Sequence, residues 1–282
     1  MSASNPAARF SRPPTKALRV VFLTVFLVWS IFPIYWLAQM SLKSPVDSQS
    51  VPPVWFFTPR LDAFKEAFLQ VPLYTQLRHS FMVAAGATLL AVVIGTLAAY
   101  ALTVLRRRRS ANIEFWILST RMAPPVAVAV PFYLSYRSFN LLDTIPGLIL
   151  VHILLVIGIV TWILIETFAS LPGDLVEAAT IDGCSPWMAF VRIMLPLARP
   201  GIVGAGVVSF LLSWNEFFFA LILTNVNART APVGVFNFIG FQAINLNALA
   251  AASMLLLIPA MVVVFVFQKF LIAGMTLGAV KG

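Results

Sequence analysis

Few side chains in this sequence of 282 residues have types and spacings suited to catalysis or metal binding. Cys184 is the only cysteine, and the two histidines, His79 and His152, are far apart and lack partners at metal-ligand spacing. We expect His79 in a loop and His152 packed between helices. A glycine-rich phosphate loop is absent, since the one Lys-Ser pair, Lys43-Ser44, has no glycines before it. The sequence predicts no catalytic residue, no metal site and no cofactor in this chain.

Another set of polar residues lies inside apolar segments. Arg121 and Glu216 should sit roughly 12 Å and roughly 24 Å into two such segments, counting 1.5 Å per helical residue. A charge in lipid is costly, so both should face the protein interior or a water-filled path. Trp214, Asn215 and Glu216 offer an aromatic face and hydrogen bonds suited to hydroxylated solutes, and with Arg121 they are candidates for a translocation path. Alternatively, these groups pair within the protein or with a partner and hold helices together.

A third set lies in the loop 169–199. Asp174 is placed to cap a helix, with Glu177 three residues later completing a capping box. Gly183 stands where that helix should stop, because glycine adopts the left-handed conformation without strain. The first half of the loop therefore predicts a short helix closed by a tight glycine turn.

The second half of this loop predicts another helix. Ser185 should cap it, Pro186 suits its first position, and Pro196 should end it. Ala178 and Ala179 in the first helix, together with the glycine turn, leave a small-residue surface that another protein is able to approach closely. The loop is either a docking element or an ordinary loop packed against its own helices.

The composition shows which elements must position these residues. Hydrophobic residues make up 60% of the chain and charged residues only 10%, whereas soluble domains carry roughly 25% charged residues. The apolar residues fall in blocks of about twenty, the length that crosses a bilayer. We therefore expect an all-α polytopic membrane protein with about six transmembrane helices, at 18–40, 80–105, 113–136, 145–168, 200–224 and 246–271.

The basic residues indicate how these spans are oriented. The net charge of +9 is placed at the ends of apolar blocks, as in membrane proteins, and leaves no basic surface for nucleic acid. With both termini in the cytoplasm, lysines and arginines are more numerous inside than outside, and the inner set includes the run Arg106–Arg109. We expect a cytoplasmic tail at 1–17, a single transmembrane domain at 18–271 containing the cytoplasmic loop 169–199, and a cytoplasmic tail at 272–282.

The loop resembles the EAA loop of permeases of ATP-binding cassette (ABC) importers. The matching positions, at the family's spacing, are Glu177, Ala178, Ala179, Gly183, Ile193, Leu195 and Pro196. Further segments resemble the carbohydrate-importer branch and its MalG-like subunit, namely 121–125, 141–144, 213–217 and 278–282. The resemblance implies a MetI-like permease fold, and it implies that the seven loop positions, with Asp182, form coupling helices that dock on an ATPase subunit.

The same resemblance implies the chain's partners and its mechanism. These partners are a second, homologous permease, two ATP-binding cassette subunits that bind ATP and magnesium, and an extracytoplasmic substrate-binding protein. The complex would import a sugar or polyol across the bacterial cytoplasmic (inner) membrane by alternating access, with this multi-pass chain embedded in lipid. Two alternatives stay open: an ABC permease for a non-carbohydrate solute, and a passive channel or membrane scaffold.

Overall fold

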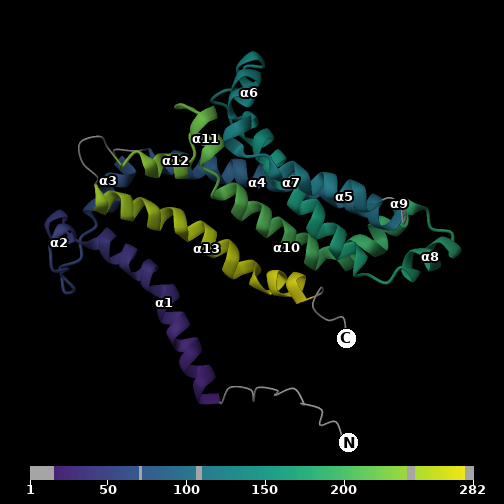
Figure 1. Ribbon diagram of the computed structural model, residues 1–282, viewed down its shortest axis with the longest axis horizontal. Coiled ribbons are helices and arrows are strands. Elements are labelled where there is room, and N and C mark those ends of the chain that lie inside the picture. Colours follow the sequence, from purple (N-terminus) through teal and green to yellow (C-terminus); the bar gives the residue numbers. More distant parts are fainter. Residues whose placement is uncertain (1–15, 70–71, 106–109, 240–244, 277–282) are drawn as a thin grey trace, which may run out of the picture.

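The computed structural model describes residues 16–69, 72–105, 110–239 and 245–276, and every regular element within them is a helix (Figure 1). Five helices in this part of the chain are long and apolar enough to cross a membrane. They are α1 (Lys16–Leu42), α4 (Leu73–Tyr100), α7 (Ile145–Ala169), the continuous run of α9, η3 and α10 (Pro186–Trp214), and α13 (Leu246–Thr276). The predicted all-α membrane protein is confirmed, and four of the six expected spans, 18–40, 80–105, 145–168 and 246–271, each lie within one continuous helical run.

The centre of the bundle is the contact among α4, α7 and α10, which lie side by side (Figure 1). Small residues let these backbones approach closely. Ala91 and Ala99 of α4 are fully buried, and a Cβ on Gly95 would lie 3.0 Å from the Val160 side chain of α7. Close packing matters here because lipid tails are as apolar as the helices, so burial alone does not drive the helices together. This unit is the scaffold that carries the loops at both ends.

The third expected span, 113–136, is wrong as a single helix. The chain forms α5 (Ser110–Ser119) and the 3₁₀ turn η2 (Thr120–Met122), and then α6 (Pro125–Ser138). Ala123 and Pro124 between them have extended backbones. A residue that precedes proline is disfavoured in the helical region, and Pro124-Pro125 impose this restriction on two consecutive residues. The segment is therefore a broken pair of helices.

The fifth expected span, 200–224, also needs correction. One helical run begins at Pro186, passes through α9 (Pro186–Ala189) and the π-helical turn η3 (Phe190–Met194), and continues as α10 (Leu195–Trp214). Pro196 was expected to end a helix but lies in the first turn of α10, where its missing N–H is tolerated. The chain then breaks before α11 (Phe218–Leu223).

Short helices lie at the end of the bundle away from α8, where Figure 1 places α2 (Pro45–Gln49), α3 (Asp62–Leu69) and α12 (Ala231–Phe236). Asn247 joins α1 to α13 there, because its Nδ2 donates to the carbonyls of Met40 and Lys43, each at 2.9 Å. Since α4 begins before residue 80, His79 lies buried within that helix and not in a loop as expected.

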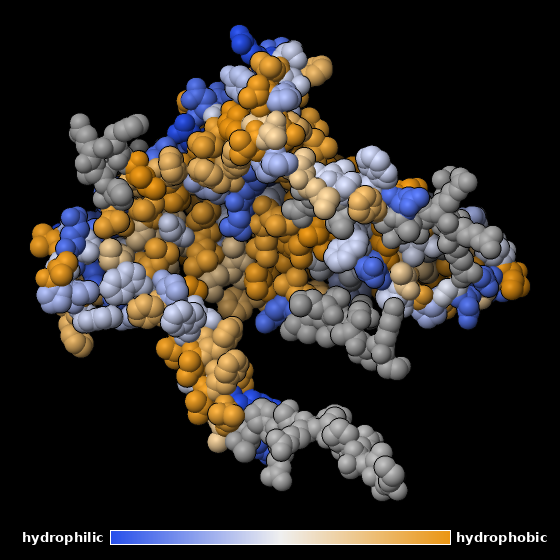
Figure 2. Space-filling view, viewed as in Figure 1, coloured by the Kyte–Doolittle hydropathy of each residue, from blue (hydrophilic) through white to orange (hydrophobic). Residues whose placement is uncertain are grey.

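Helix α1 stands apart from the bundle over most of its length (Figure 1). Residues 16–35 are all exposed, and Figure 2 shows mainly apolar residues along it. Such a surface is covered by lipid or by another protein. Of the expected tails at 1–17 and 272–282, residues 1–15 and 277–282 lie outside the described residues, whereas 272–276 are the end of α13. Arg106–Arg109 and the segment 278–282 also lie outside them, so both tails and the cytoplasmic termini stay predictions.

Candidate functional site

The loop after α7 begins with helix α8 (Asp174–Ile181), whose start differs from the expected one. Gly173 occupies the N-cap and makes no side-chain cap, so the expected capping box of Asp174 and Glu177 is wrong. The backbone of Gly173 is already helical, and the N–H of Val176 donates to its carbonyl at 3.3 Å. Asp174 thus lies inside the first turn, where its carboxylate still faces the positive end of the helix dipole.

The end of α8 is the glycine turn that the sequence predicted. Gly183 has a φ of +83°, and its N–H donates to the Thr180 carbonyl at 3.1 Å. The N–H of Cys184 donates to the Ala179 carbonyl at 2.9 Å. These two bonds form a Schellman motif, which satisfies the last carbonyls of the helix. No atom lies within 4 Å of the place where a Cβ on Gly183 would be, so this turn faces open space.

The second loop helix also starts as predicted and then continues into the membrane. Ser185 is the N-cap of α9, its Oγ accepts from the Met188 N–H at 3.2 Å, and Pro186 follows at the first position. Because η3 and α10 continue this helix, one helix runs unbroken from Pro186 to Trp214 and connects the glycine turn to the break that follows. We call this continuous helix the rod.

The eight predicted docking residues therefore lie in different environments. Ala179 is buried and packs inward, whereas Ala178, Asp182 and Gly183 are exposed on the first helix and its turn. Ile193, Leu195 and Pro196 belong to the long rod, with the first two half-buried and the proline exposed. Two large apolar side chains near the turn, Ile181 and Trp187, are 87% and 64% exposed. Sequence reasoning missed these two as docking candidates, although large apolar residues in a loop outside the predicted spans are a usable signal.

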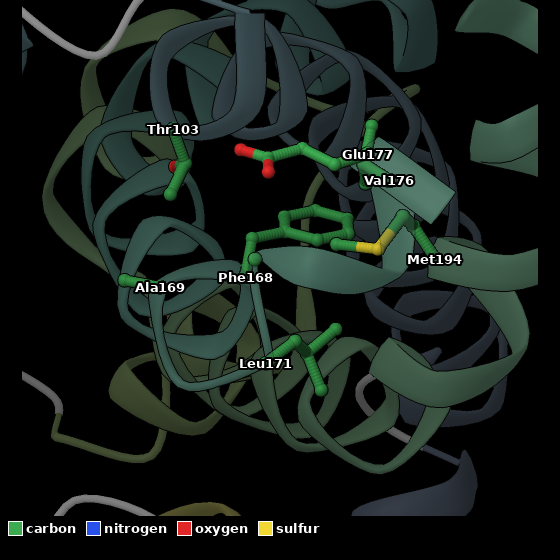
Figure 3. A pocket seen from close by; sticks show the side chains of 8 residues that line it. Thr103, Phe168, Ala169, Leu171, Val176, Glu177 and Met194 are labelled. Carbon is green, nitrogen blue, oxygen red and sulfur yellow. The ribbon is translucent and has the colours of Figure 1, made fainter. Parts of the chain in front are cut away.

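A cavity of about 420 Å³ lies beneath this loop. Its walls come from η1 (Ala101–Leu105), the end of α7, α8 and η3. Glu177, the eighth predicted docking residue, extends across the cavity toward Thr103, above Phe168 and Met194 (Figure 3). The cavity therefore separates the loop from the adjacent ends of the helices, and two of its walls are π-helical turns, which occur frequently at functional sites.

The structure describes the side chains of three of the four predicted path residues, and these three have different environments. Trp214 is 2% exposed, stacks on Phe210 at 5.7 Å, and donates from Nε1 to the Leu256 carbonyl at 3.2 Å, so it packs against α13. Asn215 is exposed, and its Nδ2 donates to the Leu211 carbonyl at 2.8 Å. Arg121 lies in η2, and its side chain is outside what the structure describes.

Glu216 instead lies in the break between α10 and α11. Its two carboxylate oxygens accept from the N–H groups of Phe219 and Ala220, at 2.9 and 3.1 Å, and so cap α11. Its Oε2 is 3.5 Å from Nε2 of His152 on α7, and Nδ1 of that histidine is hydrogen-bonded to Ser213 Oγ at 2.6 Å. His152 is 1% exposed, which confirms its expected packing between helices. Its pairing with Glu216 was not predicted, although a titratable residue within an apolar span is a signal of function.

A second carboxylate organises the end of the bundle opposite α8. Asp143, between α6 and α7, accepts hydrogen bonds from the N–H groups of residues 225–228 at 3.0–3.1 Å and from the Asn227 side chain at 2.9 Å. Desolvation raises the pKa of this carboxyl, but the backbone donors at Asn227, Asn225, Ala228 and Val226 outweigh it and lower the pKa to about 2. The segment after α11 is thus tied to the start of α7.

Comparison with known proteins places this geometry among transport proteins. The profile of a family described as binding-protein-dependent transport system inner membrane component matches residues 91–277. The chain is 35% identical to the sulfoquinovosyl glycerol transport system permease protein of Agrobacterium fabrum, over 95% of this chain and 94% of that one. It is 33% identical to the trehalose transport system permease protein of Mycobacterium tuberculosis, over 92% and 95% of the two chains. It is 29% identical to the trehalose/maltose transport system permease protein of Thermococcus litoralis, over 95% and 97%.

Solved structures with this fold are also transporters. A chain of a bacterial ABC transporter involved in the import of the acidic polysaccharide alginate superposes with a TM-score of 0.74 at 20% identity, over 92% of this chain and 99% of that chain. A chain of the MetNI methionine ABC transporter in an inward-facing conformation superposes with a TM-score of 0.56 at 18% identity, over 72% and 98%. At these identities the likeness concerns the fold.

Proposed function

Because the chain belongs to the family of binding-protein-dependent transport system inner membrane components, we propose that it is the permease subunit of an importer for a sugar or polyol, driven by separate ATPase subunits. A member of this family is a multi-pass membrane subunit of a transporter and is not itself catalytic. The importer resides in the bacterial cytoplasmic (inner) membrane.

The proposed substrate class rests on the relatives and on the chemistry of the membrane site. The named relatives transport trehalose, maltose or a sulfoquinovosyl glycerol. A buried carboxylate beside a histidine suits hydroxyl groups, which donate and accept hydrogen bonds, better than it suits an anion. A non-carbohydrate solute is the alternative within the same family.

The observation that carries the coupling role is the glycine turn standing free at the end of a long rod. Gly183 faces open space, and Ile181 and Trp187 expose apolar side chains near it. The second loop helix runs unbroken into α10 and ends next to Glu216. A displacement of the docked hairpin is therefore passed along one helix to the polar break in the membrane.

This arrangement supports alternating access. Two ATPase subunits, which bind ATP and magnesium, close on nucleotide and move the hairpin formed by Asp174–Pro196. The rod then biases the membrane helices between inward-open and outward-open states, and ligands shift this equilibrium by binding the two states with different affinities. An extracytoplasmic binding protein delivers the substrate to the opposite face.

A second, homologous permease completes the path. The exposed length of α1 and the exposed side of α7, where Leu150 and Leu154 are 47% and 55% exposed, are surfaces for that subunit or for lipid. The residues 18–271 act as one transmembrane domain, with the loop 169–199 as its cytoplasmic coupling element and short tails at both ends.

The docking role is tested by purification from native membranes in mild detergent, with ATPase activity assayed on the eluate. ATPase activity should accompany the natural chain and be reduced at least tenfold by Glu177→Lys or Gly183→Trp. Val226→Trp, a matched bulky substitution on an exposed loop at the other end, should retain it. Failure of any ATPase to accompany the natural chain would favour a passive channel or scaffold.

A further inference from the structure

Two neighbouring cavities lie within the membrane part of the bundle, beside the break that contains Glu216. One has a volume of about 190 Å³ and the other about 210 Å³. They share three wall residues, Pro125, Leu155 and Phe219. Both breaks in the membrane helices border this space, since Ala123 lines one cavity and Glu216 the other. Broken helices around a cavity at this depth are typical of substrate sites in transporters.

The smaller cavity has a polar end. His152, Ser213 and Glu216 all line it. The distance of 3.5 Å between His152 Nε2 and Glu216 Oε2 exceeds that of an ordinary hydrogen bond, and this buried nitrogen has no hydrogen-bond partner among the described residues. An unsatisfied buried polar atom is costly and calls for an explanation.

A hydroxyl group satisfies this geometry. The contact of Nδ1 with Ser213 leaves Nε2 as either a donor or an acceptor, depending on the ring tautomer. A hydroxyl both donates and accepts, so it matches either tautomer and still bonds to a free lone pair of the Glu216 carboxylate. An ammonium group or a carboxylate matches only one of these arrangements.

The larger cavity supplies an apolar and aromatic wall. Phe132 and Phe219 line it with their ring centroids 5.5 Å apart, and Leu155 separates it from the polar end. A sugar ring has this combination of a hydroxyl-bearing edge and an apolar C–H face. Each cavity is below the roughly 300–1,000 Å³ of drug-sized ligand pockets, so the pair suits one sugar unit of a larger solute.

We propose that this pair of cavities is a carbohydrate subsite within this subunit, in which His152 and Glu216 bind a substrate hydroxyl and Phe219 packs on the sugar ring. The inference rests on the proposed function and adds His152 as a binding residue. In this assignment Trp214 and Asn215 have structural roles, because the first packs against α13 and the second bonds to its own helix.

The first test measures uptake by the complete importer, with radiolabelled trehalose and maltose as probes. His152→Gln and Glu216→Gln should each raise the apparent KM about tenfold, the loss expected for one hydrogen bond to a charged or buried group, and change the maximal rate less than twofold. His79→Gln, at a buried histidine that contacts the Arg229 carbonyl away from the cavities, should leave KM unchanged. An unchanged KM in both site variants would overturn the subsite, whereas failure of the natural complex to transport either sugar would count against the proposed function.

A second measurement does not depend on the His152 and Glu216 variants, and so it tests the subsite even if those variants assemble poorly. In a Cys184→Ser background, a cysteine introduced by Leu155→Cys should react with N-ethylmaleimide, and the transported sugar should slow the reaction at least fivefold. Leu150→Cys, on the same helix but lining neither cavity, should show no protection. Equal labelling of the Leu155→Cys variant with and without sugar would contradict the proposal.

Discussion

At the residue scale, the Asp143 carboxylate accepts hydrogen bonds from the backbone of residues 225–228 and from the Asn227 side chain, and we predict that it stabilises the fold in a pH-dependent way. Its five hydrogen bonds are all accepted by the carboxylate oxygens and therefore favour the ionised form. Because the carboxyl is partly exposed, solvent screening reduces the contribution of these hydrogen bonds to the free energy of unfolding. Asp143→Ala should therefore cost about 1–2 kcal/mol of stability. The unfolding midpoint of the purified complex measures this change.

The sign of the pH dependence follows from the lowered pKa. The folded pKa of about 2 lies below the ordinary value of 3.8, so the stabilisation is complete above the ordinary value and disappears as pH falls toward 2. The difference in unfolding midpoint between the natural chain and Asp143→Asn should therefore shrink below pH 4. Asp62→Asn, at an exposed ion pair with Arg60, should change little at any pH. A constant difference for the Asp143 variant down to pH 2.5 would refute this account.

The residues that sequence reasoning placed correctly depend on local rules. Gly183 and Ser185 were predictable because a helix end and an N-cap are decided within a few residues. Asp174 was misplaced by one position, since helical backbone already begins at Gly173. The contact of His152 with Glu216 was beyond reach, because it depends on how α7 packs against the end of α10.

At the element scale, the contact between α7 and α10 makes a sharp prediction. A Cβ on Gly201 would lie 2.9 Å from Cβ of Thr167 and closer still to its Oγ1 and Cγ2. Thr167 is stiff, and its Oγ1 donates to the Ile163 carbonyl at 2.8 Å. Gly201→Ala should therefore cost about 1–3 kcal/mol by overpacking, measured as the unfolding midpoint and the yield of assembled complex.

Gly206 on the same helix is the matched control. A Cβ there would meet Val92 and Thr88 at 3.7 and 3.9 Å, which is ordinary contact. Gly206→Ala should be neutral or slightly stabilising because alanine favours the helix. Equal effects of the two substitutions would show that close packing of α7 on α10 is not what Gly201 provides.

The boundaries of the elements show where hydropathy fails as a guide. Hydropathy identified five long helices, because twenty apolar residues are needed to cross a bilayer. It merged α5 and α6, since Pro124 and Pro125 change the backbone without changing hydropathy. It also placed the start of the fifth span at Pro200, because a helix that leaves the membrane and continues into a loop is not marked by apolar residues.

At the scale of the whole molecule, the rod from Pro186 to Trp214 connects the two sites of interest. It carries the glycine turn at one end and the break with Glu216 at the other. The family and the approximate architecture were predictable from the EAA pattern and the composition, since the pattern and the composition are read directly from the sequence. The continuity of the rod, on which the proposed coupling rests, was not predictable from the sequence and is known only from the structure.

The most direct test of the central claim is sugar uptake in proteoliposomes that contain the chain with its second permease, ATPase subunits and binding protein. Radiolabelled trehalose and maltose are followed with and without ATP, for the natural chain and for Gly183→Trp. The account predicts accumulation that requires ATP and falls at least tenfold in the variant, while both chains insert equally into the membrane. Uptake that proceeds without ATP, or at the natural rate in the Gly183 variant, would contradict an importer coupled through this loop.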